Sequence, residues 1–248
     1  MNNDRFEEMM RAGERYHSLR LPAGEWPIIR VDGHGFSQLT VSHFEKPFDE
    51  QFHLHMVETA QALLEQFQGI YAYTESDEIS ILLPRDWNLF GRSQEKAVSL
   101  SAGIASATFT NASGHTVHFD SRVWLGNDEA VVDYFRWRQA DAARCALNGW
   151  CYWMLRKAGQ SVEQATRALE RQTLTAKTEL LREYEIMFEQ LPGWQRYGVG
   201  LWWEDYEKPG YNPVENKQVT AIRRGIRVEK SLPYGHEYAA FIQNLIMA

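Results

Sequence analysis

The sequence predicts an α+β fold built on a ferredoxin-like sheet, with the element order β-α-β-β-α-β over about residues 27 to 125. Three observations predict it. Short β-rich runs stand at both ends of this region and twice in its middle, helical patterns separate the outer runs from the middle pair, and only three polar residues join the middle pair. Strands joined that closely form a hairpin, and the helices supply the crossovers of a split βαβ sheet.

The elements follow in this order along the chain. The run "WPIIRVDG" predicts a first strand that stops at a carboxylate and a glycine. From Phe48 to Phe67, apolar residues recur at a period near 3.6, which indicates a helix. The runs "GIYAYT" and "EISILLP" predict a hairpin around "ESD", the small-residue segment "SQEKAVSLSAGIASATF" predicts the second helix, and "HTVHFDSRVWL" predicts the last strand.

Further elements flank this sheet. Residues 4 to 18 indicate a helix, and residues 128 to 159 indicate a long aromatic-rich helix that is interrupted or ends near Asn148 and Gly149. Two more helices, two β segments flanking a Lys-Pro-Gly turn and an Asn-Pro loop, and a final helix over 236 to 246 follow. Because no Pro- or Gly-rich linker interrupts the second half, we expect a core of residues 1–130 and a C-terminal region of residues 131–248 packed as one unit.

Composition limits the cellular setting. No apolar stretch approaches the roughly 20 residues that span a bilayer, and the N-terminus lacks the pattern of an export signal, so we expect a cytoplasmic protein with no membrane partner. The two cysteines, Cys145 and Cys151, are six residues apart, which predicts buried thiols. A net charge of −7 argues against coating nucleic acid by bulk attraction. A local basic patch at residues 217 to 230 remains a candidate RNA contact, although a solvated strand is the commoner meaning of such a pattern; it includes Arg223, Arg224 and Arg227.

The predicted strand order brings two acids together. The third strand lies antiparallel between the first and second, so the end of the first strand, at Asp32, lies beside the start of the third, at Asp77. Two carboxylates directed at one point suit a hard divalent cation such as Mg²⁺, and a pair of such ions assists phosphoryl transfer. Glu78 receives a supporting role, since successive strand residues point to opposite faces.

Groups that could bind phosphate lie near these acids in the sequence. Backbone N–H groups after the first strand could approach a triphosphate, in the segment Gly33, His34, Gly35 and Phe36. Basic side chains would add charge, and the candidates are Lys46, Arg92 and Lys96. Because no Gly-x-Ser-x-Gly and no Walker A sequence occurs, neither a serine hydrolase nor a P-loop enzyme is indicated.

Five segments taken together resemble a known family. At "RVDGHGF", "FEKPFDE", "ESDEISILL", "FDSRV" and "DYFRWRQAD", in that order, the sequence resembles the tRNA-histidine guanylyltransferase family, and within it the guanylyltransferase-like proteins of bacteria and archaea. The likeness covers about residues 4 to 200. It implies a core similar to the palm of polymerases and nucleotide addition to the 5′ end of RNA, in the 3′-to-5′ direction.

The resemblance also implies roles for individual residues. Asp32 and Asp77 match metal-binding aspartates, with the Gly33 carbonyl as a further ligand of two Mg²⁺ ions. The segment from Gly33 to Phe36 and Lys46 match a triphosphate cradle. Other matched positions are Ser76 and Glu78 in a Ser-Asp-Glu element, Arg92 and Lys96 on a basic helix, and Lys177 as an RNA contact. ATP and GTP or another nucleoside triphosphate as substrates, tRNA as partner and a homotetramer are further implications.

Two departures shape the predicted reaction. Ala143 stands where the tRNA-histidine enzymes have a histidine, and an asparagine-rich segment is absent. Alanine offers no side-chain hydrogen bond, so template-dependent repair of 5′-truncated tRNA is favoured over dedicated guanosine addition. ATP would adenylylate a 5′-monophosphate, or an existing 5′-triphosphate would serve, before the 3′-hydroxyl of a nucleotide attacks. A palm-type nucleotide cyclase and a non-catalytic RNA-binding protein remain as alternatives, although no Gly-Gly-Asp-Glu-Phe element is present.

Overall fold

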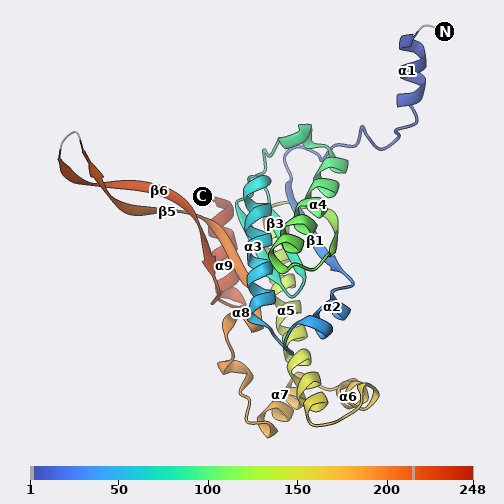
Figure 1. The fold of residues 1–248 in the computed structure, drawn as a ribbon, viewed down its shortest axis with the longest axis vertical. Coiled ribbons are helices and arrows are strands. Elements are labelled where there is room, and N and C mark those ends of the chain that lie inside the picture. The colour runs from blue at the N-terminus through green and yellow to red at the C-terminus, as the bar shows by residue number, and fades with distance from the viewer. Residues whose placement is uncertain (1–2, 214–215, 248) are drawn as a thin grey trace.

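The protein is organised around one six-stranded sheet in which all neighbouring strands are antiparallel. A computed structural model describes residues 3–213 and 216–247. The strand order is β4-β1-β3-β2-β5-β6 (Figure 1). The strands are β1 (Trp26–His34), β2 (Tyr71–Glu75), β3 (Glu78–Leu82), β4 (His118–Gly126), β5 (Val199–Asn212) and β6 (Lys217–Glu229).

Helices cover both faces of the sheet. The α-helices are α1 (Asn3–Arg11), α2 (Phe36–His43), α3 (Glu50–Gln66), α4 (Gln94–Ser113), α5 (Asp128–Lys157), α6 (Val162–Leu169), α7 (Leu174–Glu183), α8 (Gly193–Tyr197) and α9 (His236–Met247), with short 3₁₀ turns η1 (Leu89–Arg92) and η2 (Phe188–Gln190). No helix within the described ranges has the length and apolar content needed to cross a membrane.

Alternation along β1 shows how the two faces are divided. Ile29 and Val31 belong to the core cluster that contains the buried residues of α3 and α4. Ile28, which precedes Ile29 and points to the opposite face, belongs to a second cluster with buried residues of α5 and α9. A sheet buried on both faces therefore separates two apolar layers, and a side chain at the end of β1 or β3 is assigned to one side by its place in this alternation.

The order of strands agrees with the sequence prediction, because β3 lies between β1 and β2 and is antiparallel to both. Three predicted boundaries are wrong. The N-terminal helix ends at Arg11, and α5 continues through Asn148 and Gly149 to Lys157. A Cβ added at Gly149 would meet nothing within 4 Å, so this glycine marks no close approach. The Lys-Pro-Gly segment is not a turn, because Pro209 pairs with Thr220 inside the β5–β6 ladder.

Helices α6 and α7 form a lobe with the end of α5 at one end of the molecule, at the bottom of Figure 1. Leu147, Cys151 and Leu155 of α5 pack there with Ala165 of α6 and Leu181 of α7. Cys151 is buried as predicted, and its thiol donates to the Lys177 carbonyl at 3.2 Å. Cys145 is exposed, so the prediction of two buried thiols is wrong for this residue. Its place on α5 lies outside the packed stripe of that helix.

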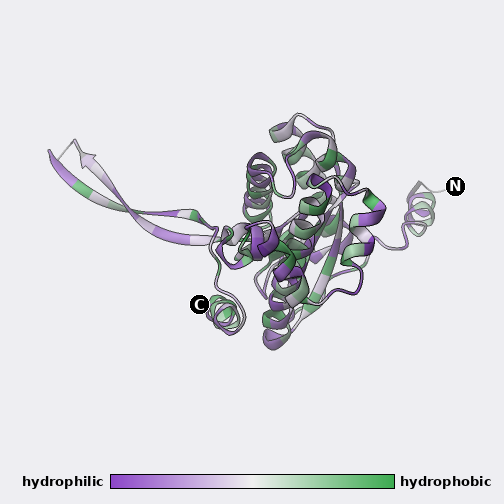
Figure 2. Cartoon of the chain, turned by 90° about the horizontal axis from the view of Figure 1, so that it is seen from below, coloured by the Kyte–Doolittle hydropathy of each residue, from purple (hydrophilic) through white to green (hydrophobic). Residues whose placement is uncertain are grey.

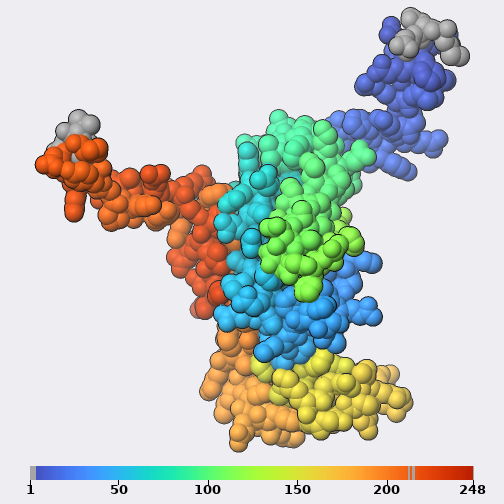
Figure 3. All heavy atoms as spheres, in the orientation of Figure 1, coloured from blue at the N-terminus to red at the C-terminus, as the bar shows by residue number. Residues whose placement is uncertain are grey.

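The outer parts of β5 and β6 project from the body as a two-stranded arm (Figures 1 and 3). β2 pairs with β5 only from Val199 to Trp202. Beyond that point β5 and β6 pair with each other as far as Asn212 and Lys217. Hydrophilic and hydrophobic residues mix along this arm, as Figure 2 shows from below.

A buried histidine joins α3 to α8. The ring of His53 stacks on Trp194 with centroids 4.2 Å apart, and its Nε2 has no hydrogen-bond partner. Burial, helped by the nearby positive charge of Lys230, lowers the pKa of His53 to about 4. Between about pH 4 and the ordinary value near 6.5, the unfolded chain therefore binds a proton that the folded protein does not.

We expect this histidine to make the protein less stable as the pH falls through that window. The free energy of unfolding should decline by up to about 1.4 kcal/mol per pH unit from this group, and the loss should be absent above pH 7. Urea unfolding at pH 7, 6 and 5 checks this. His53→Phe, which keeps an aromatic ring against Trp194, should show a shallower decline; an unchanged decline would contradict the assignment.

Candidate active site

The candidate site lies where the end of β1 meets the turn between β2 and β3. Asp32 is paired with Glu78 across the two strands, and the Gly33 N–H donates to the Asp77 carbonyl at 3.0 Å. Ser76 and Asp77 form the turn of the hairpin, with Ser76 in the left-handed region at φ 49°. The predicted crossing of the chain therefore places Asp32 and Asp77 on adjacent segments, although 45 positions separate them.

The environment of Asp77 opposes its negative charge. Burial raises the pKa of this carboxyl, and the neighbouring charge of Asp32 raises it further. The Ser76 hydroxyl, which donates to Asp77 Oδ1 at 3.0 Å, and the ammonium of Lys46 act in the other direction. Asp32 is more open, with 43% of its side chain exposed and an Arg122 nitrogen 3.9 Å from its Oδ2. A cation between the two carboxylates would relieve both burial and repulsion.

Lys46 lies close to this pair, at the end of the loop that leads to α3. Burial lowers the pKa of its ammonium, while the charges of Asp77 and Asp49 raise it. Its Nζ is 5.8 Å from the ring centroid of Trp153 on α5. Lys46 and Ser76 line two hollows of about 100 and 260 Å³, the smaller one reaching Trp194 and the larger one Asp77. The site thus combines the two carboxylates and the ammonium of Lys46 with adjoining hollows.

The segment after Asp32 can contribute backbone groups, rather than side chains, to a phosphate-binding site. The ring of Phe36 is buried, with its centroid 4.9 Å from that of Phe119. A Cβ at Gly33 would lie 2.4 Å from this ring, so glycine is required there. Gly35 has a φ of 75° and precedes the first turn of α2 without a side-chain cap, while His34 is exposed at the end of β1. The prediction for Phe36 therefore holds at most for its N–H, because its side chain belongs to the core.

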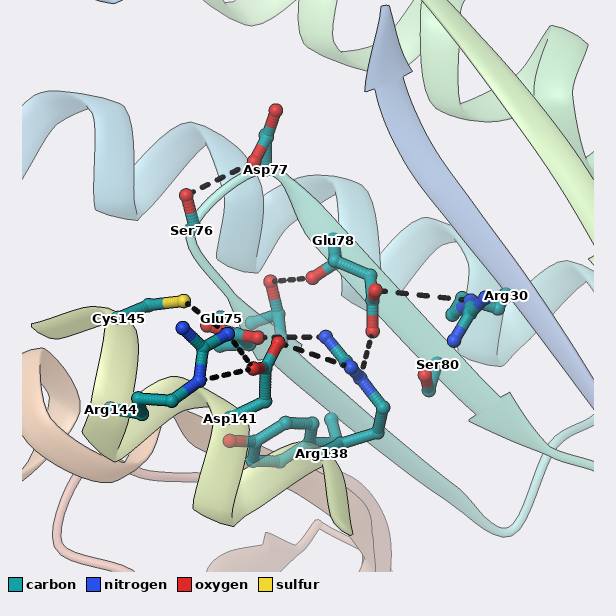
Figure 4. A network of polar contacts seen from close by, with 12 residues as sticks. Arg30, Glu75, Ser76, Asp77, Glu78, Ser80, Arg138, Asp141, Arg144 and Cys145 are labelled. Carbon is teal, nitrogen blue, oxygen red and sulfur yellow. Dashed lines mark hydrogen bonds and ion pairs between the residues drawn. The ribbon is translucent and has the colours of Figure 1, made fainter. Parts of the chain in front are cut away.

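Glu78 is turned away from Asp77 and toward α5 (Figure 4). Its Oε1 accepts from Arg138 Nε at 2.6 Å, and its Oε2 lies 3.8 Å from Arg30 Nε. Two arginines therefore occupy its carboxylate, and the supporting role predicted for Glu78 beside Asp77 stays a prediction. The reason for this orientation is the alternation of the strand, which directs the first residue of β3 to the α5 face.

Arg138 and Glu75 were missed as site residues by the sequence analysis. Arg138 Nη2 donates to Glu75 Oε1 at 3.0 Å, so one guanidinium joins the two glutamates that flank the turn. Burial raises the pKa of Glu75 to about 8 against the opposing effect of Arg138, and burial also raises the pKa of Glu78. The available signal was a pair of acids, Glu75 and Glu78, on either side of the turn, which require a buried cation.

Arg92 and Lys96 lie at the opposite end of the sheet, which corrects their predicted place beside the aspartates. Arg92 Nε donates to the Leu21 carbonyl at 2.9 Å and Nη1 to the Trp87 carbonyl at 2.6 Å. Leu21 precedes the start of β1, and six residues of strand, about 20 Å, separate that start from Asp32. Lys96 is exposed in the first turn of α4, at the same end. From Asp77 the chain runs along β3 to the opposite end of the sheet before it reaches η1 and α4, and the sequence pattern gave no measure of this distance.

We expect Arg92→Ala to act on stability. The substitution leaves the carbonyls of Leu21, Pro22 and Trp87 without the donor they share, which should lower the free energy of unfolding by about 2–3 kcal/mol. Urea unfolding measures the loss. A rise in the KM for nucleotide that exceeds what the folded fraction explains would contradict this purely structural role and indicate that Arg92 binds phosphate.

The predicted RNA contacts lie outside this site. Lys177 is on α7, and its Nζ donates to Asn148 Oδ1 at 2.8 Å. Arg223, Arg224 and Arg227 lie on the arm strand β6, where the Arg224 guanidinium is 5.3 Å from the centroid of Trp203. Arg227 also pairs with Glu204 and Glu229. These four remain predictions, and the pairing of Arg227 reduces the charge it offers.

Family models match both halves of the chain. The family model described as tRNAHis guanylyltransferase (Thg1) matches residues 7–127, and the Thg1 C-terminal domain model matches residues 129–233. The chain is 32% identical over 243 residues to tRNA(His) guanylyltransferase of Schizosaccharomyces pombe, covering 90% of this chain and 92% of that protein. It is 34% identical over 203 residues to tRNA(His) guanylyltransferase 2 of Arabidopsis thaliana, of whose length it spans 37%.

Solved structures show the same fold. A bacterial tRNA(His) guanylyltransferase (Thg1)-like protein in complex with GTP superposes with a TM-score of 0.74 at 24% identity, covering 99% of this chain and 100% of that one. The tRNA(His) guanylyltransferase of Saccharomyces cerevisiae gives a TM-score of 0.68, also at 24% identity, covering 75% and 90% of the two chains. Sequence and fold agree over nearly the whole chain. The protein therefore belongs to the tRNAHis guanylyltransferase (Thg1) family.

Proposed function

We propose that the protein is a nucleotidyltransferase that adds nucleotides, in the 3′-to-5′ direction and under the guidance of a template strand, to the 5′ end of tRNA or tRNA-like RNA. The observation that carries this proposal is the meeting of Asp32 and Asp77 at the β1 end and the β2–β3 turn, with Lys46 beside them. Membership of the Thg1 family supports it. Phosphoryl transfer depends on positioning and charge neutralisation, and these three side chains offer both.

The part of the fold that carries the site is proposed to act as a polymerase-like palm of ferredoxin-like type. Residues 1–130 would form this catalytic core, and residues 131–248 would support it as a region packed on the core. The shared sheet supports this division of labour, because β2 of the first part pairs with β5 of the second. The arginine network on α5 also reaches the turn that bears Asp77.

The residues present fit Mg²⁺. Among residues 3–213 and 216–247, no three His, Cys, Asp or Glu side chains are grouped as a metal ion requires, so a metal here must take other ligands as well. Mg²⁺ suits this condition, since it is commonly held by one or two carboxylates with water and substrate phosphates. Asp32, Asp77 and the Gly33 carbonyl would hold two such ions. When bound, they would neutralise phosphate charge and lower the pKa of the attacking hydroxyl.

The remaining residues bind and orient the nucleotide. The first N–H groups of α2, after Gly35, are oriented to receive phosphate oxygens, since a helix N-terminus binds anions. Lys46 adds a positive charge to the same phosphates, and Ser76 fixes one oxygen of Asp77. ATP would first adenylylate a 5′-monophosphate with release of pyrophosphate, and the 3′-hydroxyl of GTP or another nucleoside triphosphate would then displace AMP. An RNA with a 5′-triphosphate would release pyrophosphate instead.

The choice of RNA follows from the departure at position 143. Ala143 offers no hydrogen bond at a position where the tRNA-histidine enzymes have a histidine, which supports repair of 5′-truncated tRNA by base pairing with the opposite strand. Lys177 and the arginines of the arm are proposed RNA contacts. A homotetramer in the cytoplasm is the proposed form, in which a neighbouring chain would add positive surface to an acidic one.

The test is incubation of the purified protein with Mg²⁺, ATP, the four nucleoside triphosphates and a tRNA that lacks its first nucleotide. We expect the 5′ end to grow by the nucleotide that the opposite strand specifies, seen as a one-nucleotide shift on a sequencing gel. A tRNA with a changed opposite base is the control, and the added nucleotide should change with it. Formation of a cyclic nucleotide, or RNA binding with no extension under any condition, would overturn the proposal.

A further inference from the structure

We infer that Arg138 is a positioning residue of the reaction: its guanidinium fixes the Ser76–Asp77 turn and thereby aims the Asp77 carboxylate at the metal. This inference rests on the proposed function. It concerns a residue of α5 that touches neither of the two aspartates proposed as metal ligands. Its effect would pass entirely through the two glutamates on either side of the turn.

Arg138 is buried, with 7% of its side chain exposed, and its donors all meet carboxylates. Nε donates to Glu78 at 2.6 Å, Nη2 to Glu75 at 3.0 Å and Nη1 to Asp141 at 3.3 Å (Figure 4). The planar fork of a guanidinium fixes the directions of its bonds as well as their lengths. Arg138 therefore sets the separation and orientation of Glu75 and Glu78, and with them the two ends of the turn.

The turn contains two destabilising features that the hydrogen bonds of Arg138 oppose. Glu75 and Glu78 are paired across β2 and β3, so two acidic side chains stand directly opposite each other, which destabilises a strand pair. Ser76 is the second destabilising feature, because a residue with a side chain is strained in the left-handed region of φ. Two other contacts hold the same backbone, the Gly33 N–H to Asp77 and the Thr74 hydroxyl to the Glu78 carbonyl at 3.0 Å. Neither of them neutralises the glutamates.

The contribution of Arg138 is local to the tip of the hairpin. β3 is also paired along its length between β1 and β2, from Ile79 to Leu82. Loss of the Arg138 hydrogen bonds to Glu75 and Glu78 should therefore loosen the turn that bears Asp77 while the sheet stays paired. Asp141, the third carboxylate that Arg138 contacts, also accepts a hydrogen bond from Arg144 on the same helix. The α5 side chains around Arg138 are therefore preorganised. A residue that supports a metal ligand in this way typically affects metal affinity or activity 10- to 100-fold.

The test compares Arg138→Lys with Arg136→Gln. Lysine keeps the charge but cannot bond both glutamates in a fixed plane. Arg136 is on the same helix, is partly exposed and pairs only with Asp133 among the described contacts, so it serves as the matched control. Three quantities are measured: sensitised Tb³⁺ luminescence of the nucleotide-free protein with Mg²⁺ competition, the Mg²⁺ dependence of 5′ extension, and the midpoint of thermal unfolding.

For Arg138→Lys we expect about tenfold weaker metal binding, a 10- to 100-fold lower kcat and a nucleotide KM within about threefold of the original. Arg136→Gln should match the unaltered protein in all three measurements. If Arg138→Lys is too unstable, the double variant Arg138→Gln/Glu75→Gln removes the guanidinium together with one of its buried carboxyl partners and should show the same metal defect. Metal binding unchanged in the folded variant, with activity lost only in proportion to unfolding, would overturn the inference.

Asp77→Asn separates this inference from the proposed function. If the unaltered protein extends no RNA, yet Asp77→Asn abolishes metal binding and Arg138→Lys weakens it, the positioning role stands and the assigned reaction falls. If Asp77→Asn binds metal like the unaltered protein, there is no ligand for Arg138 to position and the inference falls.

Discussion

Replacing Asp77 by asparagine is expected to lower the rate of 5′ extension by a thousandfold or more while leaving the protein folded. Metal-bound phosphate and hydroxyl groups gain several kcal/mol of transition-state stabilisation, and about 1.4 kcal/mol corresponds to each factor of ten. Asparagine retains the size of the side chain and can accept from Ser76, but it lacks the charge that holds a divalent cation. Single-turnover extension at saturating Mg²⁺ and nucleotide measures the loss.

The same substitution should not cost stability. Burial and the charge of Asp32 raise the pKa of Asp77, which means that the folded state disfavours the ionised carboxyl. A neutral amide removes that penalty, so the free energy of unfolding of Asp77→Asn at pH 7 should equal or exceed that of the unaltered protein. The combination of a lost reaction with an undiminished free energy of unfolding is characteristic of a ligand rather than of a structural residue.

Asp32→Asn should give a comparable loss of rate, and Asp133→Asn provides the control. Asp133 is an acid on α5 that is 73% exposed and pairs with Arg136, remote from the turn. Its substitution should leave the rate within about twofold, since an exposed ion pair contributes little. If either Asp32→Asn or Asp77→Asn retained a near-normal rate, the proposed metal site would be wrong.

The sequence predicted the arrangement of the sheet because local patterns determine it. Apolar runs, a three-residue connection and two helical stretches leave few ways to connect four strands, and the pairing of Asp32 with Glu78 follows from that order. The same patterns say little about where a flexible side chain ends. Arg92 was assigned to phosphate by its charge, whereas the structure uses it to bind carbonyls at the other end of the sheet.

Contacts between distant elements explain what the sequence could not supply. Arg138 lies 60 positions from Glu78, and its role depends on how α5 crosses the sheet, which no periodicity of α5 encodes. The same holds for the projecting arm, where the Lys-Pro-Gly segment indicated a turn but lies within β5. Pro209 is tolerated there because proline is compatible with some positions of a strand pair, although it donates no hydrogen bond.

Gly33→Ala is expected to damage both the fold and the reaction. A Cβ at this position would lie 2.4 Å from the ring of Phe36, a distance that forces the ring or the backbone to move. Phe36 cannot yield easily, because it is 2% exposed and packs against other buried aromatic rings. Overpacking of this kind costs about 2–3 kcal/mol, which corresponds to a fall of roughly 4–12 °C in Tm.

The rate should fall further than the stability loss explains. The Gly33 N–H donates to the Asp77 carbonyl, and the Gly33 carbonyl is a proposed metal ligand. A backbone shift there would displace both proposed ligand groups, and a displacement near 1 Å can cost about a hundredfold. Gly103→Ala in α4 is the matched control: its Cβ meets nothing within 4 Å, and alanine favours a helix by up to about 1 kcal/mol. Opposite signs of the stability change at these two glycines, with activity lost only at Gly33, would show that close packing beside Asp32 shapes the site. A Gly33→Ala protein of undiminished stability and rate would refute that argument, because the ring of Phe36 would then have moved without consequence.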